Sequence, residues 1–103
     1  GTLAAGERYV IVMNQTEFEA TFGVGIADQA SGSISGNGDD VYTLSENGVL
    51  VDIFGEIGVD GSGEAWDYEN SVATRNAGSA ANTIWTAGEW TISAGALDAT
   101  PGN

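Results

Sequence analysis

The sequence predicts a compact, β-rich domain, and three observations support this fold class. Short runs of β-branched and aromatic residues alternate with turns rich in glycine. Two of these runs are joined by Asn47-Gly48, a dipeptide typical of β-hairpins. The chain has 16 glycines but one proline, and its three Trp, three Tyr and three Phe can fill a core. Its 103 residues correspond to one domain, which we expect over residues 1–94, with an irregular tail over residues 95–103.

The first expected element is a strand over residues 8–13. This run is rich in β-branched and aromatic residues, and both of its alternating faces are apolar. A strand with two apolar faces is covered on both sides or lies at the centre of a sheet. We therefore expect residues 8–13 to form a buried strand.

A helix of one to two turns is expected near residues 16–22. Thr16 and Glu19 have the spacing of a capping box at its start. Phe18 and Phe22 are four positions apart, so they share one face of the helix. We expect these two rings to anchor the helix to the core.

A loop and then a hairpin are expected next. Small, polar residues without a clear period occupy positions 23–38 and predict the loop. The clearest elements of the chain follow, two strands over residues 41–44 and 49–54 joined by the Asn47-Gly48 turn.

Asp52 lies among apolar residues on its face of the second strand. Because an unpaired buried carboxylate is costly, we expect it near the sheet edge or hydrogen-bonded to turn amides.

The second half of the chain predicts further extended segments after an acidic, glycine-rich turn. Residues 71–75 form a short strand in this interpretation, and a small-residue loop follows it. Residues 84–85 predict a short extended segment, and residues 90–92 predict the last strand.

The aromatic residues of this half have two interpretations. Large aromatic side chains dominate the cores of small domains, so we expect Trp66 and Trp90 to fill the core. Tyr68 and Trp85 fit the core as well as an exposed platform on which a carbohydrate stacks. Carbohydrate therefore stays open as a partner.

The charge of the chain limits its partners. Fifteen Asp and Glu face only Arg8 and Arg75, which gives a net charge of −13. Such a field repels nucleic acid and anionic membranes, since binding to phosphates needs basic side chains. No apolar run approaches the ~18 residues of a transmembrane helix, so we expect no membrane insertion. Divalent cations, basic partners or simple solubility remain as explanations of the charge.

The residue types that are missing limit the chemistry. The chain has no cysteine and no histidine, which excludes disulfides, nucleophilic triads and imidazole-ligated metals within it. Two carboxylates alone can hydrolyse a glycosidic bond, but with fifteen acids some pair falls at a suitable distance by chance. We expect no catalytic residues and no enzymatic activity.

A calcium site is one interpretation of the acidic turn. Carboxylates and a hydroxyl alternate from Asp60 to Glu64, and calcium binds six to eight oxygens from such loops. The alternative is a solvated turn in which Asp60 caps backbone amides. The candidate ligands are Asp60, Ser62, Glu64, Asp67, Asp39 and Asp40.

Arg75 is expected to have a structural role. It is one of only two cations in an acidic domain. We therefore expect it to form a partly buried, bidentate pair with an acid of the central turn.

Several motifs in register resemble those of bacterial lamin-tail domains, the version appended to secreted nucleases and other large extracellular proteins. The similarity runs from about residue 3 to residue 92, and the order and spacing of the motifs carry it. The motifs are residues 35–44 (SGNGDDVYTL), 52–61 (DIFGEIGVDG), 65–68 (AWDY), 73–76 (ATRN) and 89–91 (EWT).

The resemblance implies an all-β, immunoglobulin-like β-sandwich that is not itself catalytic. It also implies a binding or interaction module outside the cell or at its surface. The chain begins at Gly1 without a methionine or hydrophobic signal region, which we interpret as an exported, processed form or an excised fragment. The chain lacks the first strand that such domains usually have.

The missing strand suggests two alternatives to a simple binding module. A sandwich without an edge strand exposes backbone groups that another chain can pair with. The chain would then be a self-assembling subunit of an extracellular filament, and its partners would be other copies of itself. The second alternative is an accessory fragment of a secreted nuclease.

Overall fold

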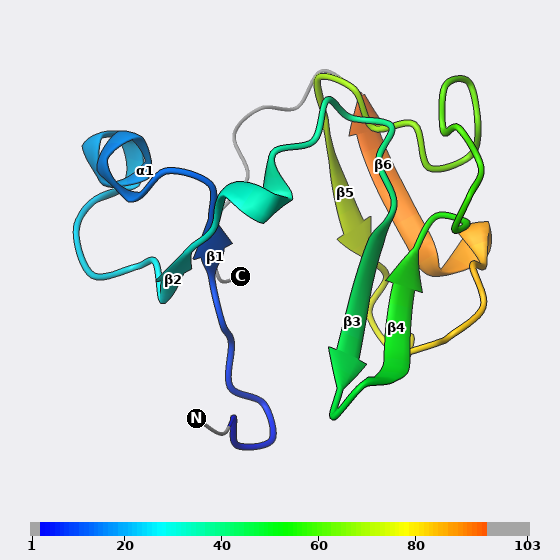
Figure 1. The fold of residues 1–103 in the computed structure, drawn as a ribbon, viewed down its shortest axis with the longest axis horizontal. Coiled ribbons are helices and arrows are strands. Elements are labelled where there is room, and N and C mark those ends of the chain that lie inside the picture. The colour runs from blue at the N-terminus through cyan, green and yellow to red at the C-terminus, as the bar shows by residue number, and fades with distance from the viewer. Residues whose placement is uncertain (1–2, 95–103) are drawn as a thin grey trace. The chain divides into compact units, whose positions relative to one another are not determined.

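The computed structural model describes residues 3–94, which divide into two compact units, one ending at Ser35 and one beginning at Gly36. Most of the regular structure is strand, arranged in two-stranded sheets with one short α-helix (Figure 1). The prediction of a small β-rich fold is confirmed. The sequence predicted one domain over residues 1–94, whereas the structure has two units within that span. The predicted tail over residues 95–103 lies outside the described residues.

The strand of the first unit is much shorter than predicted. Only Ile11–Val12 form β1, which pairs in parallel with β2, Gln29–Ala30. Of residues 8–13, Val12 alone is buried, whereas Tyr9, Ile11 and Met13 are 49%, 44% and 52% exposed. The expected burial on both faces is therefore wrong. The physical reason is that the faces of a strand are buried by elements packed onto them, whereas β2 lies beside β1 at its edge and pairs with two of its residues.

The helix of the first unit has a different cap from the one predicted. Helix α1 spans Gln15–Phe22, and the Asn14 side chain accepts a hydrogen bond from the Glu17 amide at 3.2 Å. Thr16 therefore lies inside the helix, and the predicted capping box is wrong. Asparagine is among the strongest N-cap residues, and it precedes the helix by one position. The helix ends at Gly23, whose amide donates to the Glu19 carbonyl at 2.9 Å.

The two phenylalanines of α1 pack against each other but not into a core. Their ring centroids are 4.8 Å apart, as expected from their spacing. No residue of α1 is buried, and Phe22 is 38% exposed. The expected anchoring of the helix by Phe18 and Phe22 is therefore not seen within this unit.

The predicted loop over residues 23–38 contains β2 and a short 3₁₀-helix, η1, at Gly32–Ile34.

The second unit is built from two antiparallel pairs of strands. The hairpin β3 (Tyr42–Glu46) and β4 (Val49–Phe54) turns at Asn47 and Gly48, whose φ angles are 51° and 79°. These positive values fit the predicted turn and confirm the hairpin. Leu44 pairs with Asp52 and Ser45 pairs with Leu50, so this register shift leaves Val51 as one bulged residue in β4.

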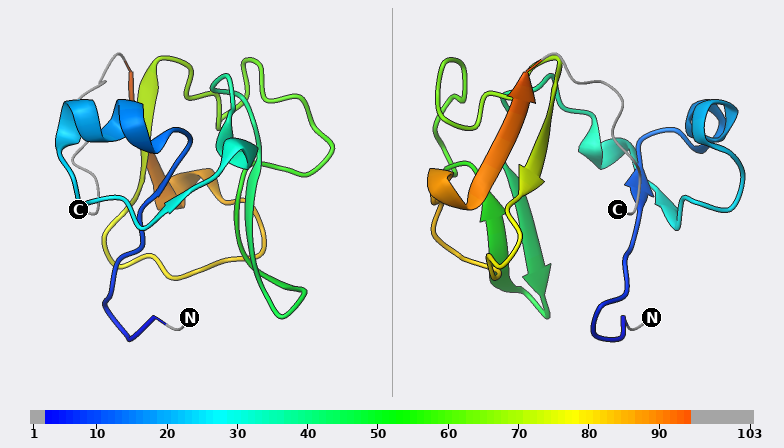
Figure 2. Two further views of the ribbon diagram at one scale, coloured as in Figure 1. Left: turned by 60° about the vertical axis from the view of Figure 1, so that its left-hand side comes forward. Right: turned by 180° about the vertical axis from the view of Figure 1, so that it is seen from behind.

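The second pair consists of β5, Ser71–Arg75, and β6, Trp90–Ala94. Both strands were predicted, although β6 is longer than expected. The predicted extended segment at residues 84–85 is not a strand, and a 3₁₀-helix, η2, at Ala87–Glu89 leads into β6. The two pairs form separate sheets that lie side by side in this unit (Figures 1 and 2).

Among the described residues, no helix is both long and apolar enough to cross a membrane.

The buried apolar side chains of the second unit are Ile53, Phe54 and Trp66. Trp66 is the most buried at 3% exposure, as predicted for a core residue. Trp90 is half-buried, and it packs against Phe54 with ring centroids 4.9 Å apart.

Candidate functional site

Phe54, the last residue of β4, organises a cluster of aromatic rings. Its ring makes edge-to-face contacts with Tyr68, Trp85 and Trp90, at centroid distances of 5.4, 5.2 and 4.9 Å. Trp66 joins the cluster through Trp85, at 5.7 Å. Edge-to-face packing is a favourable geometry for aromatic pairs and adds to the gain from burial. The cluster therefore holds the two sheets of the second unit together.

An open, mainly apolar cavity of about 340 Å³ lies beside this cluster. Its walls come from both sheets: β3 and β4 supply rings on one side, and β5 and β6 supply small and aromatic side chains on the other. A smaller cavity of about 140 Å³ shares some of these walls. The larger cavity is lined by Tyr42, Phe54, Tyr68, Ser71, Val72, Ala73 and Trp90.

The polar end of this cavity is formed by two phenols. The rings of Tyr42 and Tyr68 lie 6.3 Å apart, and their side chains are hydrogen-bonded to each other. Burial raises the pKa of the Tyr68 phenol well above its usual value, and the hydrogen bond with Tyr42 and the charges of Asp40 and Asp39 raise it further. This end of the cavity therefore lies in a negative electrostatic field.

Asp40 approaches the same end. A Cβ added at Gly36 would clash with both the Tyr42 hydroxyl and the Asp40 carboxylate, so these two groups lie close together. The Asp40 carboxylate also accepts a hydrogen bond from the Asn37 amide at 2.8 Å. This bond fixes the carboxylate next to the phenols.

Arg75 of β5 pairs with two carboxylates, and the one from Asp52 connects it to the other sheet. Its guanidinium pairs with Asp52 of β4 and, at 3.2 Å, with Glu89. Its side chain is 19% exposed, and its Cζ lies 4.5 Å from the centroid of Trp90. The prediction that Arg75 is paired and partly buried is confirmed, but the pair is not bidentate, because its two terminal nitrogens contact different carboxylates. The predicted partner in the central turn is wrong, because Asp52 precedes that turn and Glu89 follows β5.

Backbone groups complete this network around Asp52. Its carboxylate accepts from the Ile53 amide at 2.9 Å and from the Asn82 amide at 3.1 Å. The Asn82 side chain in turn donates to Glu89 at 3.1 Å. The sequence predicted that Asp52 would be hydrogen-bonded to amides, but it gave no sign of Asn82 or Glu89. Those contacts join segments far apart in the chain, and no local pattern indicates them.

The acidic loop between β4 and β5 uses its carboxylates mainly to cap backbone amides. Asp60 accepts from the Ser62 amide at 3.0 Å, and this bond holds the pKa of Asp60 below its usual value. Asp67 accepts from the amides of Gly63 and Glu69 at 2.9 and 3.2 Å, and these bonds lower its pKa in the same way. These contacts correspond to the solvated, amide-capping interpretation of the turn.

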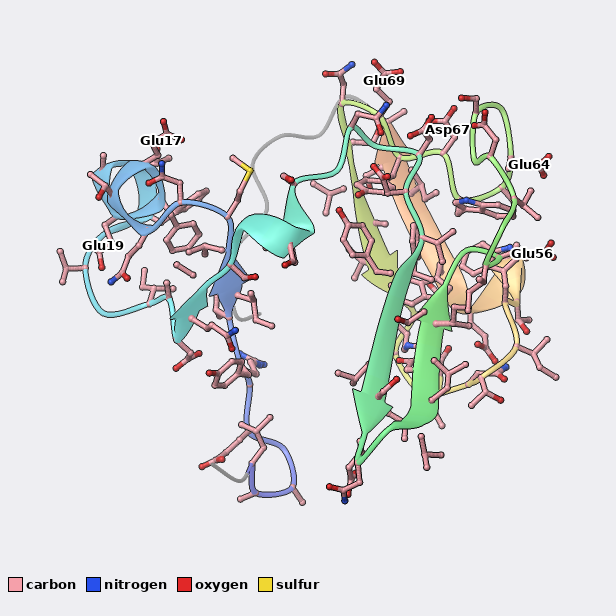
Figure 3. All side chains as sticks on the ribbon, in the orientation of Figure 1. Glu17, Glu19, Glu56, Glu64, Asp67 and Glu69 are labelled. Atoms are coloured by element: carbon pink, nitrogen blue, oxygen red, sulfur yellow. The ribbon has the colours of Figure 1, made fainter. Side chains whose placement is uncertain are left out.

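The candidate calcium ligands are only partly brought together. The Ser62 hydroxyl donates to Asp39 at 2.8 Å, which joins two of the six candidates across the sequence. Glu64 is exposed and projects outward from the loop, as do Glu56 and Glu69 (Figure 3). Within residues 3–94, no three acidic side chains are arranged to hold a metal ion. The calcium site therefore stays a prediction that this geometry does not support.

Two glycines make room for Trp66 behind the acidic loop. Gly55 has a φ of 90°, and a Cβ there would meet the indole ring and Val41. A Cβ at Gly61 would clash with the indole nitrogen and with the Asp39 carbonyl. The Nε1 of Trp66 has no hydrogen-bond partner among the described residues. The glycines of the loop thus serve close packing around a buried tryptophan.

Comparisons with protein-family models, with curated proteins and with solved structures find no match to this chain.

Proposed function

We propose that this chain is a non-catalytic, extracellular interaction module of the lamin-tail type. In this proposal the β3–β4 and β5–β6 sheets are the two layers of an immunoglobulin-like β-sandwich. The series of motifs between residues 35 and 91 supports the assignment. The absence of histidine, cysteine and lysine from the sequence supports a role without catalysis.

The observation that carries the proposed function is the open cavity of about 340 Å³ in the second unit. Ligand pockets of proteins typically have volumes of about 300–1,000 Å³ and mostly apolar walls. The walls here are rigid, because strands carry Tyr42, Phe54, Val72 and Trp90. Aromatic residues of this kind are enriched at the centres of protein interfaces. We therefore assign a protein partner to this cavity.

A photocross-linking experiment tests this assignment. A photoreactive amino acid replaces Ser71, which lines the cavity, and the control variant carries it at Ser45, an exposed residue of β3 that does not line it. Both variants are irradiated with the extracellular protein fraction of the source organism. We expect a defined adduct from the Ser71 position only. Equal labelling at both positions, or none at Ser71, would reject the cavity as the interaction site.

A second candidate function is a self-assembling filament subunit, and the first unit supplies the observation that favours it. Residues 9–13 are apolar, yet only Ile11 and Val12 pair with β2. Tyr9, Ile11 and Met13 are exposed, and a strand added from another copy would cover this apolar surface. Light scattering at high protein concentration separates the two candidates. A monomer at all concentrations would reject the filament.

A further inference from the structure

The aromatic cavity combines the features that proteins use to bind organic cations. Four of its seven lining residues carry aromatic rings: Tyr42, Phe54, Tyr68 and Trp90. Tyr42, Tyr68 and Trp90 are half-buried residues that line this open cavity. The face of an aromatic ring attracts a cation through its quadrupole, and a cage of several rings strengthens this attraction.

Negative charge lies near the two phenols that line the cavity. Asp40 lies next to the Tyr42 hydroxyl, and the charges of Asp39 and Asp40 both act on Tyr68. The cavity is also lined by the apolar Phe54, Val72 and Ala73. A ligand that complements both the apolar lining and the nearby negative charge needs an apolar stem and a positive head. The long side chains of arginine and lysine have this composition.

The second unit already holds one cation in this way. Arg75 lies over the Trp90 ring at 4.5 Å and pairs with Asp52 and Glu89. The same combination of rings and carboxylates recurs at the cavity. Arg75 is the only cation of the sequence between residues 36 and 94, and its charge is already matched. Within the described part of this unit, no cation remains for Asp39 and Asp40.

We propose that the aromatic cavity binds an arginine or lysine side chain from a basic segment of a partner protein. This inference rests on the proposed function and names the chemistry of its partner. A metal ion is a poor alternative, because it needs several oxygens and the lining is mainly apolar. Nucleic acid is repelled by the net charge of −13. A neutral carbohydrate carries no charge that would be attracted by Asp39 and Asp40.

Two matched peptides test the proposal on the full chain. One is a short glycine- and serine-rich peptide with a central arginine, and the other has citrulline at that position. Citrulline has nearly the shape of arginine but no charge. Binding is followed by the amide NMR signals of residues 71–73 and by tryptophan fluorescence. We expect the arginine peptide to shift the signals of residues 71–73 and to bind at least fivefold more tightly than the citrulline peptide.

Two variants then locate the charge that the cation recognises. Asp40→Asn removes one negative charge beside Tyr42 but keeps an oxygen that accepts from Asn37. Glu46→Gln removes the same charge from an exposed residue that lines neither cavity. We expect affinity for the arginine peptide to fall severalfold in Asp40→Asn and to stay within twofold of the original in Glu46→Gln.

Three outcomes would overturn the inference. The first is equal affinity for the arginine and citrulline peptides. The second is a set of shifts that excludes residues 71–73. The third is tight binding of a neutral oligosaccharide at those residues, which would make the cavity a carbohydrate site. If the two peptides bound equally well but a partner were cross-linked at Ser71, the cation inference would be rejected and the proposed function would still be supported.

Discussion

The guanidinium of Arg75 in β5 pairs with the carboxylate of Asp52 in β4, two residues 23 positions apart that belong to different sheets. Glu89 accepts from the same guanidinium, and Trp90 lies beneath it. One cation therefore balances two partly buried acids and connects the two sheets of the second unit.

Replacing Arg75 by alanine should destabilise the protein by about 2 kcal/mol, because two partly buried carboxylates lose their cation. Arg8 is the only other cation and is exposed, so Arg8→Ala is the matched control. We expect the control to change stability by less than about 0.5 kcal/mol. Urea unfolding followed by tryptophan fluorescence measures both. Equal stability of the two variants would show that the network contributes little.

A methyl group at Gly61 should disturb the packing around Trp66. The added Cβ would clash with the indole nitrogen and the Asp39 carbonyl, and overpacking of this kind costs about 1–3 kcal/mol. Gly88→Ala is the control, because a Cβ there meets no atom within 4 Å. Neither glycine has a left-handed φ, so the comparison isolates the clash. Equal melting temperatures for the two variants would contradict this account of the loop.

The Tyr68 phenol should make the protein less stable at high pH. Its pKa is raised in the folded protein, so the unfolded chain loses this proton first, from about pH 10. The stabilisation is complete below pH 10 and is lost as the pH rises toward the folded value. Unfolding measured as a function of pH should show that the free energy of unfolding falls less steeply above pH 10 in Tyr68→Phe than in the original protein. Tyr9→Phe changes an exposed phenol of the first unit. In this variant the free energy of unfolding should fall with pH as steeply as in the original protein.

The N-cap of α1 should depend on Asn14. Asn14→Ala removes the acceptor of the Glu17 amide and should destabilise the helix by about 1 kcal/mol. Thr16→Ala should have a smaller effect, because Thr16 lies inside the helix. Hydrogen exchange of the α1 amides measures this local change. Faster exchange in Thr16→Ala than in Asn14→Ala would restore the predicted capping box.

Calcium should leave the melting temperature unchanged, because the carboxylates of Asp60 and Asp67 already accept from backbone amides. Melting curves with calcium and with a chelator check this. If calcium raised the melting temperature and Asp60→Asn removed the rise, the cation site predicted from the sequence would be established instead.

The elements that the sequence predicted well are those set by local chemistry. The hairpin between Tyr42 and Phe54 follows from Asn47-Gly48, because these residues tolerate the positive φ that the turn requires. The burial of Trp66 follows from the size of its apolar surface. The helix was found, but its start was displaced, because the spacing of Thr16 and Glu19 predicted a cap two residues after Asn14, which caps the helix in the structure.

The elements that the sequence predicted poorly depend on distant partners. Residues 8–13 have the composition of a buried strand, but burial requires a neighbour, and β2 supplies two residues. The cavity was missed for the same reason. Tyr42 and Val72 line it together although they lie 30 positions apart and belong to different sheets. Asp52 and Arg75 did carry a signal in the sequence, because a lone acid on an apolar strand face and a rare cation in an acidic domain both need a partner.

The contacts of Asp52 also have a consequence for the order of folding. The β3–β4 hairpin closes through a two-residue turn, whereas Asp52 meets Arg75 and Asn82 across 23 and 30 residues. Closing long loops is entropically costly, so local contacts form first and distant ones later. The ion network would then form late, after the hairpin. Removal of this network should accelerate unfolding more than it slows folding. The network would therefore contribute kinetic stability to the second unit.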